Sequence, residues 1–206
     1  MIGIICAMKI EADAIRASLT DTRTEVVSGV EFTVGKRYGK EIVLAVCGIG
    51  KVFAAICTEA MILRFAPSLI LNSGVAGTLT EALSIGDIAI AKNLVQHDMD
   101  TSPLGDPVGL VSGINKIYFD ADKAAVTAFA KATASVGANS VIGTIASGDQ
   151  FMSDTAKKNA IRDRFGAIAC EMEGAAIAHV AYVNNVPFAV LRAISDSASG
   201  DAQMEY

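Results

Sequence analysis

Apolar and polar positions along the chain follow two spacings, one typical of buried strands and one typical of helices. Short apolar runs predict strands at residues 2–7, 67–77, 85–98, 141–149 and 187–195, and a hairpin at 32–47 that turns near residues 38–40. Apolar residues at helical spacing predict helices at residues 11–19, 48–66, 120–137, 155–165 and 174–185. Residues 101–118 hold two prolines and three glycines and are predicted to form a loop.

The repeated succession of strand and helix predicts an α/β domain with three layers. The chain has 206 residues, which suits one domain with a sizeable core. No internal repeat, low-complexity linker or block of like charges divides it. We therefore expect a single domain over residues 1–206.

The amino-acid composition indicates which kinds of partner this chain could bind. Apolar residues make up 52% of the chain, a high share for a soluble monomer, and a buried subunit interface would absorb the excess. The net charge is −5 and no cluster of Lys and Arg is present, which argues against a nucleic-acid partner.

The sequence also argues against membrane insertion and secretion. The longest uncharged run, residues 174–191, is interrupted by a histidine, two asparagines and a proline, which do not suit a spanning helix. Residues 1–8 have neither a basic region before them nor a cleavage site after them. Four scattered cysteines are expected to be reduced core thiols: Cys6, Cys47, Cys57 and Cys170. These features predict a cytoplasmic protein.

Carboxylates near both ends of the segment from residue 171 to residue 196 are the strongest functional signal. Asp196 follows a strand of nearly unbroken apolar character, and open α/β sheets place their chemistry beyond the carboxyl ends of such strands. Glu11 opens a helix after the first predicted strand, where a negative charge is also favourable for the helix itself. A catalytic role for Glu11 therefore requires that other carboxylates converge on the same crevice.

Three further motifs each have a functional and a structural interpretation. The segment CGIGK at 47–51 is close to a dinucleotide fingerprint, but Phe53 replaces its third glycine, so a tight turn near another ligand is favoured. The segment HDMD at 97–100 favours a hydrogen-bonded structural cluster over a metal site, because the chain has only one other histidine. Phe151 either fills the core or stacks on a flat ligand, as aromatic rings do with heterocycles.

Taken in order, these pieces resemble the nucleoside phosphorylase/hydrolase superfamily, and most specifically its 5'-methylthioadenosine/S-adenosylhomocysteine nucleosidases. The resemblance spans nearly the whole chain and rests on the segments GIICAMKIE (3–11), GIGKV (48–52), NSGVAG (72–77), GDIAIA (86–91), VQHDMD (95–100), ASGDQF (146–151), EMEGAAIAHV (171–180) and VPFAVLRAISD (186–196). It implies a three-layer αβα sandwich with a mixed central sheet, assembled as a homodimer. It implies no metal and no organic cofactor.

The resemblance also implies a division of roles among the site residues. Asp196 matches the general acid that protonates N7 of the leaving purine, a contribution of about 10²–10⁴-fold. Ser195 would orient Asp196, and Arg192 would support the loop. Glu11 matches the residue that positions and deprotonates the attacking water. This division requires Asp196 to be protonated and Glu11 to be ionised near neutral pH.

The same resemblance places the nucleoside. Glu173 matches the residue that accepts hydrogen bonds from the 2'- and 3'-hydroxyls of the ribose, and Met172 packs beside the sugar. Phe151 would stack on adenine, whose edge the backbone of Met152 would contact.

An apolar pocket is expected for the 5' substituent. By position, Met8, Ile49 and Tyr206 would line it, and Leu104 of the partner subunit, with Pro107 in the same loop, would complete it. The family commonly carries larger aromatic residues at the places of Leu104 and Tyr206, so we expect a somewhat altered pocket.

Hydrolysis is favoured over phosphorolysis by the anion ligands. The phosphorylases of the superfamily hold phosphate with an Arg and a Ser in the segment that here reads NSGVAG. This chain has Asn72 and Val75 at those places, and Glu11 would repel phosphate nearby. Because an unpaired acid beside a dianion costs several kcal/mol, about the scale of a broken buried ion pair, water is the better nucleophile.

Three functions remain open from the sequence. The first is a nucleosidase acting on methylthioadenosine and S-adenosylhomocysteine, with 5'-deoxyadenosine or 6-amino-6-deoxyfutalosine as further substrates. The second is a purine nucleoside phosphorylase, and the third is a nucleoside-binding protein without catalysis. The chain ends at Tyr206, where the family continues with a C-terminal helix, and we expect poorly held residues 197–206 and reduced activity.

Overall fold

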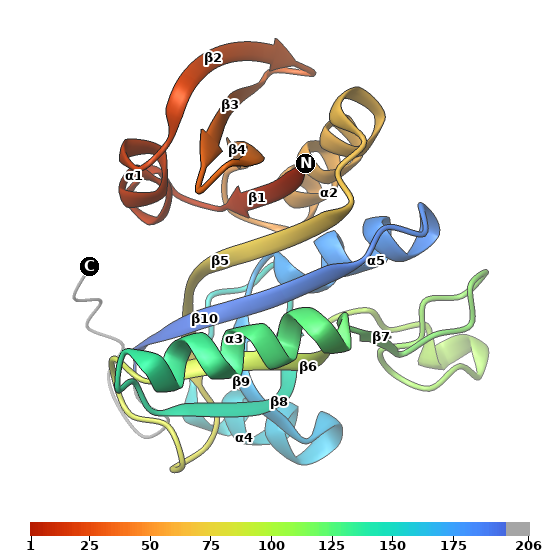
Figure 1. Ribbon diagram of the computed structural model, residues 1–206. Helices are drawn as coiled ribbons and strands as arrows, with labels where there is room; N and C mark the ends of the chain where they lie inside the picture. The colour runs from red at the N-terminus through yellow and green to blue at the C-terminus, as the bar shows by residue number, and fades with distance from the viewer. Residues whose placement is uncertain (197–206) are drawn as a thin grey trace.

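The computed structural model describes residues 1–196, which form a ten-stranded mixed sheet with helices packed against it (Figure 1). The strands are β1 (Ile2–Cys6), β2 (Thr20–Val27), β3 (Val30–Arg37), β4 (Lys40–Val46), β5 (Leu69–Thr78), β6 (Ile88–Gln96), β7 (Tyr118–Asp120), β8 (Ser140–Ser147), β9 (Ala167–Glu171) and β10 (Phe188–Asp196). The helices are α1 (Lys9–Ala17), α2 (Lys51–Phe65), α3 (Lys123–Ser135), α4 (Thr155–Phe165) and α5 (Gly174–Val183), with a 3₁₀ turn at Ser102–Leu104.

Local signals in the sequence set the ends of several helices. The side chain of Asp122 accepts a 2.8 Å hydrogen bond from the backbone N–H of Ala125 at the start of α3. Asp154 does the same for Lys157 at the start of α4, at 3.0 Å. These carboxylates satisfy backbone donors that a helix leaves unpaired at its first turn. Helix α2 ends at Phe65, and the next residue, Ala66, has the left-handed conformation directly before Pro67.

The strand order brings chain segments from both halves of the molecule to one edge of the sheet. The order is β10-β6-β8-β9-β5-β1-β4-β3-β2, and β10 also pairs with β5, so that five strands close into a ring. Strands β1 and β10 each pair in parallel with β5. Their carboxyl ends therefore lie together; β1 leads to Glu11, and β10 ends at Asp196.

The helices shield the sheet from solvent. Helix α3 crosses the front of β6 and β10 in Figure 1, whereas α2 and α5 pack against each other elsewhere on the sheet. The main core cluster joins strand residues such as Ile5 and Val43 to Met61 of α2 and Ile177 of α5. The α/β fold with a mixed sheet expected from the resemblance is confirmed.

The predicted elements are present in the structure, which has in addition the short strands β7 and β9 and the polar strand β2. The hairpin turns at Tyr38 and Gly39, both at positive φ (50° and 74°), and connects β3 with β4. Strand β2 was not predicted, because its sequence TDTRTEVV has little apolar character and most of it is exposed. The loop at 101–118 contains the 3₁₀ turn and the first residue of β7. In residues 1–196 no helix is long and apolar enough to cross a bilayer.

Candidate active site

A cavity of about 320 Å³ lies where the carboxyl ends of β1, β5 and β10 meet. Its volume is at the lower end of the range for small-molecule sites in proteins. The charged side chains that line it are all carboxylates, namely Glu11, Glu171, Glu173 and Asp196. The remaining lining residues are Ala7, Met8, Ile49, Val75, Ala76, Gly77, Gln150, Phe151, Met152, Cys170, Met172 and Ser195.

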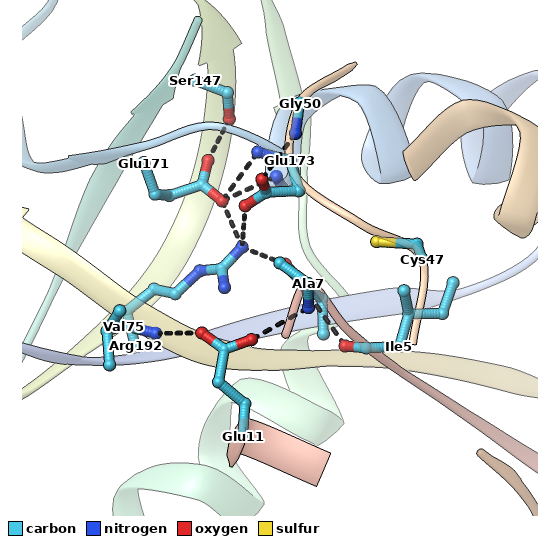
Figure 2. A network of polar contacts seen from close by, with 12 residues as sticks. Ile5, Ala7, Glu11, Cys47, Gly50, Val75, Ser147, Glu171, Glu173 and Arg192 are labelled. Atoms are coloured by element: carbon cyan, nitrogen blue, oxygen red, sulfur yellow. Dashed lines mark hydrogen bonds and ion pairs between the residues drawn. The ribbon is translucent and has the colours of Figure 1, made fainter. Parts of the chain in front are cut away.

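Backbone donors from β5 and from the turn after β1 fix the carboxylate of Glu11 at one side of the cavity. Its Oε2 accepts 2.9 Å hydrogen bonds from the N–H groups of Ala7 and Met8, and its Oε1 accepts one of 3.0 Å from Val75 (Figure 2). Gly74 makes this approach possible, since a side chain there would come within 2.6 Å of the carboxylate. Each carboxylate oxygen can accept two hydrogen bonds, so Oε1 retains a free acceptor site for water.

Arg192 lies behind the cavity among three carboxylates and an amide, and together they form what we call the Arg192 cluster: Arg192, Glu171, Glu173, Glu11 and Asn72. Its guanidinium lies between Glu171 and Glu173 on one side and Glu11 on the other (Figure 2). It bonds directly to Glu171, donates to Asn72 at 2.6 Å and lies 3.6 Å from Glu173. Burial alone would lower the pKa of Arg192, but the surrounding carboxylates outweigh that effect and raise it.

Glu173 is a carboxylate of this cluster whose acidity is altered by its surroundings. Its Oε1 accepts a 2.8 Å hydrogen bond from the N–H of Gly50, a residue whose φ of 100° favours glycine. Burial raises the pKa of Glu173 to about 7, and the nearby charge of Glu171 adds to the rise, although Arg192 and Gly50 oppose it. Glu173 therefore changes charge near neutral pH while facing the cavity.

Glu171 is held more tightly than Glu173 and organises the turn from β9 into α5. Its Oε2 accepts hydrogen bonds from the N–H groups of Glu173 (3.1 Å) and Gly174 (2.8 Å), in addition to the contact with Arg192. Its Oε1 accepts from Ser147, whose hydroxyl oxygen accepts in turn from Ala175 at 2.7 Å. This chain of bonds fixes the segment that presents Met172 and Glu173 to the cavity.

Asp196, at the end of β10, lies at the other side of the cavity. The ammonium group of Lys158 in α4 is 2.8 Å from its Oδ2, and both side chains are nearly completely buried, at 2% and 5% exposure. Gly77 pairs with Asp196 across β5 and β10, and a side chain there would come within 2.8 Å of the carboxylate. The hydroxyl of Ser195 lies 3.5 Å from Oδ1.

The structure brings ten of the expected site residues to this cavity: Glu11, Asp196, Met8, Ile49, Val75, Phe151, Met152, Met172, Glu173 and Ser195. Phe151 is 53% exposed, so its ring does not fill the core. Leu104 does not line the cavity and is 84% exposed on the 3₁₀ turn, and Tyr206 lies outside the described residues. Arg192 was expected to support the loop near Asp196, whereas the structure places its guanidinium between the carboxylates of its cluster.

Two charged residues of the site were not found from the sequence. Lys158 shares the buried face of α4 with Ile161 and Phe165, at a spacing of three and seven residues. That spacing is visible in the sequence and would have indicated a buried lysine. Glu171 stands two residues before Glu173 in the same motif, but its inward direction depends on the turn into α5.

The segment HDMD at 97–100 forms a hydrogen-bonded cluster at the start of α2. Asp98 accepts a 2.6 Å bond from the ammonium group of Lys51 and a 2.9 Å bond from the N–H of Asp149. Asp149 in turn accepts a 2.8 Å bond from the N–H of Lys51. Within residues 1–196 no group of three or more His, Cys, Asp or Glu side chains could hold a metal ion.

Comparisons with known proteins agree with this geometry. The model of the phosphorylase superfamily matches residues 1–206. A 5'-methylthioadenosine/S-adenosylhomocysteine nucleosidase of Shewanella loihica is 39% identical over 207 residues, covering the whole of this chain and 90% of that protein.

Solved structures show the same similarity. A mutant of the Helicobacter pylori protein MTAN with 5'-methylthioadenosine in the active site superposes with a TM-score of 0.93 at 36% identity, covering 98% of this chain and 87% of that one. A mutant of the futalosine hydrolase of Helicobacter pylori gives a TM-score of 0.92 at 36% identity, with the same two coverages of 98% and 87%. The chain therefore belongs to the phosphorylase superfamily and, within it, to the family of 5'-methylthioadenosine/S-adenosylhomocysteine nucleosidases.

Proposed function

We propose that this protein hydrolyses the N-ribosidic bond of 5'-methylthioadenosine and S-adenosylhomocysteine and releases adenine, in keeping with a role in methionine salvage. The observation that supports it best is the placement of Glu11, Glu173 and Asp196 around one cavity, since these residues come from distant parts of the chain. N-ribosidic cleavage needs an acid for the purine, an acceptor for the sugar and an aligned water, and the cavity offers a carboxylate for each.

At the base end, Asp196 donates a proton to N7 of adenine as the bond to the sugar breaks. Phe151 stacks on the purine, and the backbone of Met152 contacts the edge of the ring. The exposed Phe151 ring and the buried Met152 both line the cavity, which fits these roles. Ser195, with its hydroxyl 3.5 Å from Asp196, orients the carboxyl group.

At the sugar end, Glu173 accepts hydrogen bonds from the ribose hydroxyls and Met172 packs beside the ring. Glu11 positions the water that attacks C1' and takes its proton. The three backbone donors that hold Glu11 leave one of its oxygens able to accept from water, which supports this role. The oxygen of the water thus joins C1', one of its protons goes to Glu11, and the proton of Asp196 leaves with adenine.

The charges of the cavity favour water over phosphate as the nucleophile. All four charged residues in its lining are acidic, and like charges in a poorly hydrated site repel strongly. Asn72 is fully buried. Its amide donates a hydrogen bond to the backbone carbonyl of Ile5 and accepts one from Arg192, so it does not face a bound anion. Val75 has no polar side-chain atom to offer.

The substituent at the 5' position of the substrate would meet Met8 and Ile49. One of the solved structures that superpose well on this chain is a mutant of a futalosine hydrolase. We therefore include 6-amino-6-deoxyfutalosine, with 5'-deoxyadenosine, among the substrates to be tested beside the two thioethers.

Release of free adenine by the purified protein tests the proposal. We expect adenine to form from methylthioadenosine at the same rate with and without phosphate, since water is the nucleophile. A rate that requires phosphate would identify a phosphorylase instead. Glu11→Gln and Asp196→Asn should each slow turnover by about 10²-fold or more, because each removes a proton-transfer group. Binding without turnover in the unaltered protein would identify a nucleoside-binding protein.

We also propose that the protein acts as a homodimer in the cytoplasm. Helix α2 exposes an apolar stripe that continues from the rim of the cavity, formed by Ile49, Val52, Phe53, Ile56 and Leu63. Stripes of this kind on soluble proteins commonly mark interfaces. A second copy covering it would bring its loop, with Leu104 of the partner subunit, toward the open side of the cavity. The four cysteines are buried free thiols, which suits a reducing compartment.

Sedimentation of the unaltered protein and of Ile56→Glu tests the dimer. A charge in the middle of the stripe should shift the protein to monomers and lower activity, because the cavity would lose its second wall. Val136→Glu is the matched control, since Val136 is 77% exposed at the end of α3. A protein that sediments as a monomer without any substitution would overturn the dimer proposal.

A further inference from the structure

Lys158 is a buried cation that the roles assigned above do not use. Its side chain is 2% exposed, and its ammonium group lies 2.8 Å from the carboxylate of Asp196. Placing a lysine inside a protein is costly unless its charge is matched, so a lysine directed at the proposed acid calls for a chemical reason. The inference below rests on the proposed role of Asp196 as a proton donor.

The two charges stand in a particular relation to the reaction. Before the bond breaks, Asp196 must carry a proton, and a cation in contact with it favours the form without that proton. After the proton has moved to N7, Asp196 is a carboxylate, and the same cation stabilises it. Lys158 therefore opposes the starting state of the acid and supports its final state.

The other groups around Asp196 do not reproduce this effect. On β9, Cys170 lines the cavity near Asp196, and burial raises the pKa of its thiol to about 12, so it is neutral. On β5, Gly77 has no side chain, and on β10, Ser195 is uncharged. The other charged groups of the lining, Glu11, Glu171 and Glu173, are acids and repel a second negative charge.

We propose that Lys158 is a positioning residue that sets the pH range in which Asp196 works as an acid. It makes proton donation to N7 easier when Asp196 is protonated, at the cost of leaving fewer molecules protonated as the pH rises. The proton itself passes from Asp196 to the purine.

The proposal predicts that two pH profiles differ in shape. Lys158→Met removes the charge and keeps a long apolar side chain. We expect the kcat/KM of this variant for methylthioadenosine, divided by that of the unaltered protein, to rise with pH, because the charge of Lys158 favours loss of the proton that Asp196 must donate. This ratio should change by about tenfold or more between about pH 5 and about pH 9.

Three companion variants separate the electrostatic role from a structural one. Lys157→Met makes the same chemical change at the neighbouring, exposed position of α4 and should leave the profile unchanged. Lys158→Arg keeps the charge and should keep the alkaline limb of the profile in place. Lys158→Gln removes the charge with a polar side chain, so it repeats the test if Lys158→Met does not fold, as judged by its melting curve.

The outcomes are distinct. Profiles of Lys158→Met and Lys158→Gln that are lowered by the same factor at every pH would show a merely structural role and overturn the proposal. An alkaline limb that moves with Lys158→Arg as far as with Lys158→Met would overturn it as well. Failure of the unaltered protein to release adenine would instead contradict the proposed function, and that result is seen before any variant is made.

Discussion

Two buried sets of charged side chains border the cavity, and their acidic groups are neutralised in different ways. In the Arg192 cluster one guanidinium lies among Glu171, Glu173 and Glu11, whereas the ammonium group of Lys158 lies against the carboxylate of Asp196. In the cluster, burial, with the nearby charge of Glu171 in addition, raises the pKa of Glu173 to about 7. The comparison teaches that a buried carboxylate can be prepared for different tasks by how its counter-charge is shared.

The difference follows from the chemistry of the two cations. A guanidinium is planar and has five N–H donors, so Arg192 can bond to Glu171 and Asn72 and still lie 3.6 Å from Glu173. An ammonium group is a compact charge with three donors, which suits the close contact with Asp196. In our proposal the shared charge prepares Glu173 to accept from neutral hydroxyls, and the matched charge prepares Asp196 to release a proton.

Removing the shared cation should have the largest effect. We expect Arg192→Met to lower the free energy of unfolding by about 3–5 kcal/mol, because it leaves several buried carboxylates without their counter-charge. Urea unfolding at neutral pH measures the loss. Arg162→Met is the matched control, since Arg162 is 45% exposed and pairs with its neighbour Asp163 at the surface. Equal losses in the two variants would contradict this account of the cluster.

Changing Glu173 should separate activity from stability. Glu173→Gln removes an ionised acceptor for the ribose hydroxyls and should lower kcat/KM by about 100-fold. The raised pKa means that the fold favours the neutral acid, so this stabilisation is fully present below the ordinary value of 4.5 and is lost as pH rises through about 7.

Glutamine cannot ionise and keeps that stabilisation at every pH. The melting temperature of Glu173→Gln should therefore increase relative to that of the unaltered protein as the pH rises from 5 to 8. A difference in melting temperature that does not change with pH would show that Glu173 is not the group that titrates.

Two glycine-to-alanine substitutions, one beside Asp196 and one beside the Arg192 cluster, test the two sets of charges in parallel. Gly77→Ala places a carbon within 2.8 Å of the Asp196 carboxylate and should lower kcat/KM about tenfold through displacement of the acid. Gly74→Ala meets the Glu11 carboxylate at 2.6 Å and also the Arg192 guanidinium, so it should lower stability as well as activity. Activity assays and melting curves of both variants test this difference. Equal losses of stability in the two variants would contradict it.

The smallest effects are expected from the two serines. Ser147→Ala removes the hydroxyl that links Glu171 to the N–H of Ala175 and should cost about 1–2 kcal/mol of unfolding free energy. Ser195→Ala removes a contact of 3.5 Å, at the limit of hydrogen bonding, and should cost about 0.5 kcal/mol or less. A larger loss for Ser195→Ala would mean that the pair at Asp196 depends on its hydroxyl more than the geometry indicates.

The agreement between sequence and structure depends on how local each signal is. Apolar spacing and capping residues such as Asp122 and Asp154 act within one element, and the helices they predict are present. Strand β2 escaped prediction because it is a polar, mostly exposed strand stabilised by pairing with β3, a partner that its own sequence does not reveal.

The residues of the site also differ in how local their sequence signals are. Glu11 and Asp196 could be named because each follows a predicted strand, and Glu173 because its segment resembles the family motif; their roles remain predictions. Arg192 reads in the sequence as one polar residue inside an apolar strand, and nothing local indicates which acids it meets. Lys158 was passed over although its spacing to Ile161 and Phe165 places it on the buried face of its helix.

The sequence by itself determined the kinds of element, their order and the family to which the chain belongs, because helical and strand periodicity and short motifs are properties of neighbouring residues. The tertiary structure alone decided how the charges are shared: that Arg192 joins three acids and that Lys158 faces Asp196. Those contacts link residues brought together by the parallel pairing of β5 with β1 and β10 and by the packing of α4, and electrostatic energy depends on distances in space rather than along the chain.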